Sequence, residues 1–168
     1  MAPVQTEKIA GLILQLADSD GVIRTKAREE LVEMGGPEVT QALVVELNDH
    51  RRSVRWEAAK GLISIADPIA APALAHHLHD DDGDVRWLAA EGLSSLGLIG
   101  LQTTLTSAIH HASNPEFVRA VHHSLKEFRK HKVQTTVLDP VIKACEDSEP
   151  GVSLPVAAYK ALEQIRAS

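Results

Sequence analysis

Cysteine, aromatic side chains and long apolar runs are all scarce in this chain of 168 residues. Its one cysteine, Cys145, excludes an internal disulfide and fits a reducing compartment. Aromatic residues make up only 3% of the chain, which disfavours a β-sandwich and favours helices that pack through small side chains. The longest apolar run, residues 9–14, is far too short to span a bilayer, so we expect a cytoplasmic protein with no membrane contact.

Positive charge is in deficit as well. The chain has 17 Lys and Arg residues against 23 Asp and Glu residues, a formal net charge of −6. Such an acidic chain is poorly suited to follow a phosphate backbone, which disfavours nucleic acid as a partner. With 44% hydrophobic residues it can still bury a core, which excludes a disordered chain.

The sequence does contain an internal repeat with a period of 31 residues. Residues 54–62 (VRWEAAKGL) match residues 85–93 (VRWLAAEGL) at seven of nine positions. A related segment begins 31 residues earlier at Ile23, and looser copies lie at 117–125 and 154–162. Apolar residues recur 0, 4, 8 and 11 places after the start of each copy, which is the spacing of one helical face. Such repeats bury their apolar faces only by stacking on one another.

A second helix is expected before each of these segments, because an apolar position also recurs there. Its members are Leu12, Leu43, Leu74, Leu105 and Val141. The sequence thus predicts an all-α solenoid of about five two-helix units in a single domain, residues 1–168. Outer helices are expected near residues 5–17, 37–48, 69–79, 100–111 and 133–146. Inner helices are expected near 21–34, 52–66, 84–97, 115–130 and 153–166, so the units span about 5–34, 37–66, 69–97, 100–130 and 133–166.

An aspartate and an arginine also recur with this period, six residues apart. The pairs are Asp18 and Arg24, Asp49 and Arg55, and Asp80 and Arg86. Stacking would set these carboxylates beside guanidinium groups, and such directional pairs would fix the register of neighbouring units. In the last unit Pro155 takes the arginine position. We expect Pro155 in the first turn of its helix, where a missing N–H leaves no intrahelical bond unmade.

The two-helix unit, the Val-Arg-x-x-Ala-Ala-x-Gly-Leu helix and the Asp to Arg spacing resemble HEAT repeats, specifically the HEAT-like type first noted in phycobilin lyase subunits. The resemblance is strongest over residues 18–97 and weakest over residues 131–168, where the unit is about five residues longer. It implies a right-handed α-solenoid whose Val-Arg helices line the concave face. Members of this family serve as scaffolds, as enzyme subunits and, in one branch, as a metal-dependent hydroxylase, so the fold alone does not define the function.

We call the first residue of each copy its anchor; the anchors are Ile23, Val54, Val85, Phe117 and Leu154. Positions two, three and six after each anchor are expected to point away from the core and into the groove of the concave face. Trp56 and Trp87 share one such position in adjacent units, about 10 Å apart by helix packing distances. Tryptophan is common at the centres of protein interfaces, so this pair indicates a binding patch. The alternative is that each indole seals the joint between two units. The predicted partner-binding residues are Trp56, Glu57, Lys60, Trp87, Leu88, Glu91 and His123.

The sequence gives little support to metal or catalytic chemistry. Three histidines, His76, His79 and His110, could share a transition-metal site, but no carboxylate or cysteine repeats with them, so we predict no metal. The hydroxylase branch holds iron with His-Glu pairs just after Val-Arg, where this chain has tryptophans that cannot ligate a metal. Cys145 falls on a core position, and no phosphate cradle or nucleophile elbow occurs. We therefore predict no catalytic residue and no cofactor.

These features predict a non-catalytic scaffold that recognises a protein or peptide on its concave face. The alternative is an accessory subunit of a lyase-like or tetrapyrrole-handling enzyme, which the resemblance implies and which would stack its ligand on the same tryptophans. Stacking of nucleic-acid bases is disfavoured by the mixed charge of the groove. The last inner helix has no polar unit after it, so a homodimer through the terminal repeats is a further expectation.

Overall fold

A computed structural model describes residues 3–167 of the chain. This part contains ten α-helices and no strand, as the repeat predicts. The α-helices are α1 (Pro3–Gln15), α2 (Gly21–Met34), α3 (Gly36–Glu46), α4 (Arg52–Ile65), α5 (Ala71–His76), α6 (Gly83–Ser95), α7 (Gly97–His111), α8 (Pro115–Lys130), α9 (Thr135–Cys145) and α10 (Pro150–Ala167). Two 3-10 segments, η1 (Pro68–Ala70) and η2 (His77–His79), flank α5. Within residues 3–167, none of the helices combines the length and apolar character of a membrane span.

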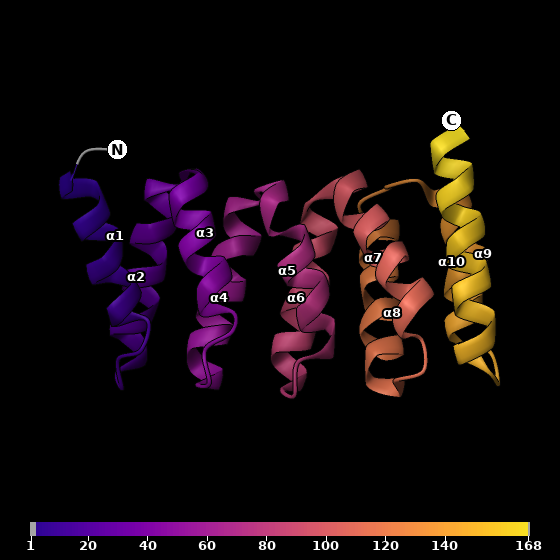
Figure 1. The fold of residues 1–168 in the computed structure, drawn as a ribbon, viewed down its shortest axis with the longest axis horizontal. Helices are drawn as coiled ribbons and strands as arrows, with labels where there is room; N and C mark the ends of the chain where they lie inside the picture. The colour runs from indigo at the N-terminus through magenta and orange to yellow at the C-terminus, as the bar shows by residue number, and fades with distance from the viewer. Residues whose placement is uncertain (1–2, 168) are drawn as a thin grey trace.

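The helices follow one another along a single long axis, so the molecule is an elongated solenoid (Figure 1). The four helices α2, α4, α6 and α8 pack side by side, and we call them the motif row because α4 and α6 carry the Val-Arg motif. Behind them α1, α3, α5 with its 3-10 segments, and α7 form the cover row. The core is the continuous seam between these two rows.

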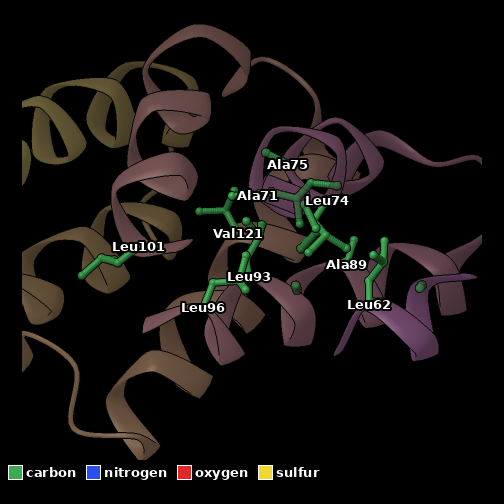
Figure 2. Close-up of a cluster of buried hydrophobic side chains, with 14 of the residues drawn as sticks. Leu62, Ala71, Leu74, Ala75, Ala89, Leu93, Leu96, Leu101 and Val121 are labelled. Atoms are coloured by element: carbon green, nitrogen blue, oxygen red, sulfur yellow. The ribbon is translucent and has the colours of Figure 1, made fainter. Parts of the chain in front are cut away.

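The anchor residues of the motif row fill this seam. Val54, Val85 and Phe117 are completely buried, which confirms the apolar spacing read from the sequence. Figure 2 shows Leu74 from α5, Leu93 from α6 and Val121 from α8 meeting in the seam. Ile23 alone among the anchors is 36% exposed, because α2 is the first helix of the row.

The glycine of the repeated motif lets the two rows approach closely. A Cβ at Gly61 would lie 2.9 Å from Cδ1 of Leu43, and a Cβ at Gly92 would lie 3.0 Å from Cδ1 of Leu74. Both leucines come from the cover row and are completely buried. In α4 and α6 the glycine therefore leaves room for a leucine of the helix before it.

The last two helices reverse the arrangement of rows. Helix α9 packs on α8 of the motif row, and α10 packs on α7 of the cover row. The prediction that residues 133–146 form an outer helix and residues 153–166 an inner one is therefore wrong. The four helices α7 to α10 form a bundle in which each contacts two others.

The turn after α8 explains this reversal. Lys132 adopts a left-handed conformation with φ of 58°, and the N–H of Val133 donates to the carbonyl of Phe128 at 3.0 Å. This is the hydrogen bond of a Schellman stop, which ends a helix and redirects the chain. Gln134 is left-handed too, with φ of 43°, and α9 then runs back along α8.

The position of Pro155 also differs from the expectation. Helix α10 begins at Pro150, so Pro155 lies inside the helix and not in its first turn. A proline at this point leaves the carbonyl of Gly151 without its intrahelical donor. Gly151 is exposed, so water can satisfy that carbonyl.

Candidate partner-binding surface

The arginine after each anchor clamps the turn that precedes its own helix. Its Nη1 donates to the main-chain carbonyl of the aspartate six residues earlier, and not to the carboxylate. The three bonds run from Arg24, Arg55 and Arg86 to the carbonyl oxygens of Asp18, Asp49 and Asp80, at 2.8, 3.1 and 2.7 Å. The regular spacing of these residues therefore serves first to close each turn.

A full carboxylate–guanidinium pair joins the second unit to the third. Nε and Nη2 of Arg55 donate to the two carboxylate oxygens of Asp80, both at 2.9 Å. Burial would raise the pKa of Asp80, but hydrogen bonds from Arg55, from the N–H of Asp82 and from Asp81, together with the charge of Arg55, outweigh burial and hold that pKa below its usual value. The predicted ladder is thus present at this joint, where a bidentate pair fixes α4 against α6.

Arg24, the equivalent arginine of the first unit, has no such partner. Asp49 corresponds to Asp80 in sequence, but Arg51 binds its carboxylate through Nε at 2.8 Å and Nη2 at 2.6 Å. These hydrogen bonds hold the pKa of Asp49 well below its usual range. In the part of the chain that the structure describes, Nε of Arg24 is buried without a hydrogen-bond partner, 4.0 Å from Oε1 of Glu57.

Glu57 does not project from the surface as predicted. The residue is only 2% exposed, and Nε of Arg28 donates to its Oε2 at 2.9 Å. Arg28 reaches across from α2, so this ion pair closes the joint between α2 and α4. The next two units have alanine, Ala59 and Ala90, at the position equivalent to Arg28. An arginine at a position that is otherwise alanine is the sequence signal for a buried glutamate nearby.

Trp56 lines the first of two hollows on the motif row. It is half-buried, and Nζ of Lys60 lies 4.4 Å from the centroid of its ring, a cation–π contact one helical turn along α4. The hollow measures about 350 Å³ and we call it hollow A. Its lining residues are Arg24, Arg52, Ser53, Trp56, Glu57 and Asp84.

Trp87 lines the second hollow, one unit further on. It is 54% exposed, and its Nε1 donates to Oε1 of Glu91 at 3.0 Å. Its ring stacks on the imidazole of His123 from α8, with 3.3 Å between centroids and 22° between planes. This hollow, hollow B, measures about 200 Å³. Its lining residues are Gly83, Arg86, Trp87, Glu116, Arg119, Ala120 and His123.

His123 is held as a neutral imidazole beneath Trp87. Burial lowers the pKa of His123, and the carboxylates of Glu127 and Glu91 offset only part of that effect. Within residues 3–167 its Nε2 has no hydrogen-bond partner. The stack therefore joins α6 to α8 through ring contact, with no charge on the imidazole at neutral pH.

The structure thus gathers most of the predicted site residues on one row of helices. Trp56 lines hollow A and contacts Lys60, while Trp87 and His123 line hollow B and Glu91 accepts the hydrogen bond of Trp87. Leu88 departs from the prediction, because it is half-buried and packs against the core. The arginines that line both hollows were not predicted as site residues. The signal for two of them is an arginine shortly before each tryptophan, Arg52 four residues before Trp56 and Arg86 immediately before Trp87. The other two, Arg24 and Arg119, come from neighbouring helices.

A hollow of about 670 Å³ between α5 and α7 is lined by two of the three histidines considered for metal binding, His76 and His79. His111, and not His110, lies beside His79, with 4.9 Å between ring centroids. Burial lowers the pKa of His79, whose ring also stacks on Phe117. Among the described residues, no three His, Cys, Asp or Glu side chains are arranged to hold a metal ion.

The comparisons with known proteins agree with this architecture. A sequence model of HEAT repeats matches residues 9–94, slightly more than half of the chain, and the chain belongs to the HEAT-repeat family. The solved complex of CpcE and CpcF of phycocyanin lyase from Nostoc sp. PCC7120 has a similar fold, with a TM-score of 0.62 and 20% identity over 93% of this chain and 98% of that chain. An engineered protein gives a TM-score of 0.44 and 19% identity over 98% of this chain and 81% of its own. No curated protein sequence matches the chain significantly.

Proposed function

We propose that this HEAT-repeat chain is a non-catalytic scaffold that binds a protein or peptide on the exposed, concave face of its motif row. The observation that carries the proposal is the placement of both tryptophans of the chain at neighbouring hollows on that face. An indole that is 54% exposed, as Trp87 is, gains free energy when a partner covers it. Exposed tryptophans at the centre of a rigid surface are typical of binding hot spots.

The ion pairs between units support the same function, because they hold the hollows in shape before a partner arrives. Arg28 and Glu57 tie α2 to α4, and Arg55 and Asp80 tie α4 to α6. A surface that is already ordered loses little conformational entropy when it binds. Stacked repeats also present an extended surface, which suits a long peptide or a helix better than a compact ligand.

A second candidate is an accessory role beside a lyase-like or tetrapyrrole-handling enzyme. Hollow B favours it, because a planar ring could stack on Trp87 while Arg86 and Arg119 bind carboxylates. The solved complex of similar fold is that of a phycocyanin lyase. Visible absorbance that co-purifies with the protein, and is lost in Trp87→Ala, is the result expected for this candidate. A colourless protein that retains a protein partner is the result expected for the scaffold.

The scaffold is tested by affinity capture from native lysate. The bait variants are Trp56→Ala plus Trp87→Ala, and the matched control Val45→Ala plus Ile69→Ala, which removes exposed apolar side chains from the cover row and η1. We expect one specific protein to bind the wild type and the control but not the tryptophan variant. Circular dichroism and thermal melting establish that each variant is folded. A partner retained by a folded tryptophan variant would contradict the proposal.

A further inference from the structure

We propose that hollows A and B recognise an acidic segment of the partner, with its carboxylates on Arg24 and Arg119 and its apolar side chains against Trp56 and Trp87. This inference rests on the proposed function and names the chemistry of the partner. It is carried by the ion pairs of the two hollows, in each of which two arginines share one carboxylate: Arg24 and Arg28 share Glu57, and Arg86 and Arg119 share Glu116.

In hollow A both carboxylates already have their own cations. Arg52 pairs with Asp82 at 2.6 Å and also with Asp84. Glu57 pairs with Arg28, which lies outside the hollow. Arg24 donates from Nη1 to two main-chain carbonyls, which carry no net charge, and its Nε has no hydrogen-bond partner among residues 3–167. Arg24 therefore shares the carboxylate of Glu57 with Arg28, and its Nε, 4.0 Å from Oε1, makes no hydrogen bond to it.

The repeat itself shows which ligand Arg24 lacks. In the next unit the equivalent Arg55 binds a carboxylate, that of Asp80, through Nε and Nη2. In the first unit Arg51 binds the corresponding carboxylate of Asp49. Within the described part of the chain, the guanidinium group of Arg24 therefore has no aspartate carboxylate to which it can donate. The side chain of Arg24 is 22% exposed and lines hollow A, so a carboxylate supplied by a partner can contact its guanidinium group from the hollow.

Hollow B holds the same imbalance in another form. Arg86 contacts Oε2 of Glu116 through Nη2 at 2.8 Å, and Arg119 pairs with Oε1 of the same carboxylate. Two guanidinium groups therefore share one carboxylate. The side chain of Arg119 is 67% exposed, so it is free to turn to a second carboxylate from outside.

The two hollows also adjoin, so one segment can reach both. Asp84 lines hollow A and Gly83 lines hollow B, and these consecutive residues form the first turn of α6. Trp56 lines hollow A from α4, and Trp87 lines hollow B from α6. Along the motif row the order is Arg24, Trp56, Trp87 and Arg119, so a segment with apolar residues between two acidic ones matches it.

The test uses the full chain and three synthetic peptides of equal length, in which a central run of leucines is flanked on both sides by glutamate, by glutamine or by lysine. The two tryptophans are the chain's only ones, so indole fluorescence reports binding directly, and Trp56→Phe and Trp87→Phe separate the two hollows. We expect the glutamate peptide to bind and to change the fluorescence of both tryptophans. Because the attraction is ionic, its affinity should fall as salt is raised.

Variants then identify the arginines involved. Glu116→Gln releases both arginines of hollow B, and we expect it to tighten binding of the glutamate peptide by about threefold to fivefold, the scale of an exposed ion pair. Arg119→Gln should weaken binding by a similar factor, and the matched Arg166→Gln, on an exposed arginine of α10, should change nothing. Arg24→Gln also loses two bonds to the turn, so the exposed Glu116 and Arg119 carry the test.

Equal binding of the glutamine peptide, preference for the lysine peptide, or an unchanged affinity in Glu116→Gln would each overturn the inference. These failures are distinct from failure of the proposed function. A partner captured through the tryptophans, with no binding of the glutamate peptide, leaves the scaffold in place and refutes the acidic segment. Loss of tryptophan dependence in both experiments refutes the scaffold itself.

Discussion

Arginine at the position after each anchor has a different partner in each unit, although its backbone setting is the same. All three residues clamp the preceding turn, yet Arg55 also binds Asp80 of the following unit, Arg86 binds Glu116, and Arg24 binds no carboxylate at hydrogen-bond distance among the described residues. What differs is the neighbour that each guanidinium meets across the joint. The residue that each arginine meets across the joint thus decides whether the arginine is paired within the chain or is available to bind a ligand.

The stack of Trp87 on His123 should respond to pH. Burial lowers the pKa of His123 below its usual 6.5, so the unfolded chain binds this proton more tightly than the folded chain. Stability is therefore unaffected above pH 6.5 and falls as the pH drops from there through the lower folded-state pKa. In Trp56→Phe, where Trp87 is the only indole, we expect fluorescence to be constant above that pH and to change with a midpoint below it.

The control for this titration is His123→Gln in the same background, which should remove the fluorescence change. His79 also has a pKa lowered by burial, so acid weakening of overall stability should persist in that variant. A fluorescence midpoint at or above 6.5, or a change that survives in His123→Gln, would contradict the stacked and neutral imidazole.

At this scale the sequence predicts a site residue only when its surroundings come from its own unit. Trp56 and Trp87 could be placed from the repeat because their position on the helix face decides their exposure. The burial of Glu57 could not, because it depends on Arg28, which is 29 residues away and belongs to the neighbouring helix. Ion pairs across a joint are set by two units together, and a pattern within one unit does not contain them.

Helix α7 follows α6 so closely that one glycine controls their contact. Helix α6 ends at Ser95 and α7 begins at Gly97, and a Cβ at Gly100 would lie 1.8 Å from the carbonyl oxygen of Leu93. No side-chain adjustment relieves a clash with main chain, so Gly100→Ala must displace one helix from the other. We expect a loss of stability of about 2–4 kcal/mol, measured by urea unfolding with circular dichroism.

Gly11→Ala is the matched control, because a Cβ there meets nothing within 4 Å. Alanine is favoured over glycine in a helix by up to about 1 kcal/mol, so this variant should be as stable as the wild type or slightly more stable. Equal unfolding curves for Gly100→Ala and the wild type would show that α6 and α7 do not approach as described.

The positions of the helices are the part of the fold that the sequence predicts best. The apolar anchors recur with the period of the repeat, and each predicted helix lies within a few residues of an observed one. The outer helix expected at 69–79 is instead divided into η1, α5 and η2. Pro68 and Pro72 stand at or near the start of the first two of these pieces, where a proline costs no hydrogen bond.

Across the whole molecule, the reversed last pair divides the chain into two kinds of packing. Helices α1 to α8 stack in two rows, and the last four helices, α7 to α10, close into a bundle. The apolar spacing could not predict this, since it shows which face of a helix is buried and not which row covers it. Leu138 on α9 and Leu154 on α10 are completely buried in the bundle and would be so in either row. The reversal depends on left-handed Lys132 and Gln134, residue types that give no sign of such a turn.

We therefore expect that the bundle of α7 to α10 can loosen while the stacked helices at the start of the chain keep their structure. Burial raises the pKa of the Cys145 thiol to about 12, so it should react slowly with a thiol reagent at pH 8. Leu154→Ala removes a completely buried side chain at a cost of about 2–5 kcal/mol, and we expect at least about tenfold faster labelling of Cys145. Amide exchange in α1 to α3 should stay unchanged, because stacked units depend on their neighbours.

Val156→Ala, at an exposed position of the same helix, is the control and should leave labelling of Cys145 slow. Faster amide exchange in every helix of Leu154→Ala, α1 included, would show that the molecule unfolds as one unit and would contradict the division.

The most direct test of the binding surface is site-specific photo-crosslinking. A benzoylphenylalanine is placed at position 87 in hollow B or, in a separate protein, at position 45 on the exposed side of α3. After illumination with native lysate, we expect the protein labelled at position 87 to form one specific crosslink to a partner, and the protein labelled at position 45 to form none. A specific crosslink from position 45 alone, with both proteins folded, would contradict the assignment of the motif row as the binding face.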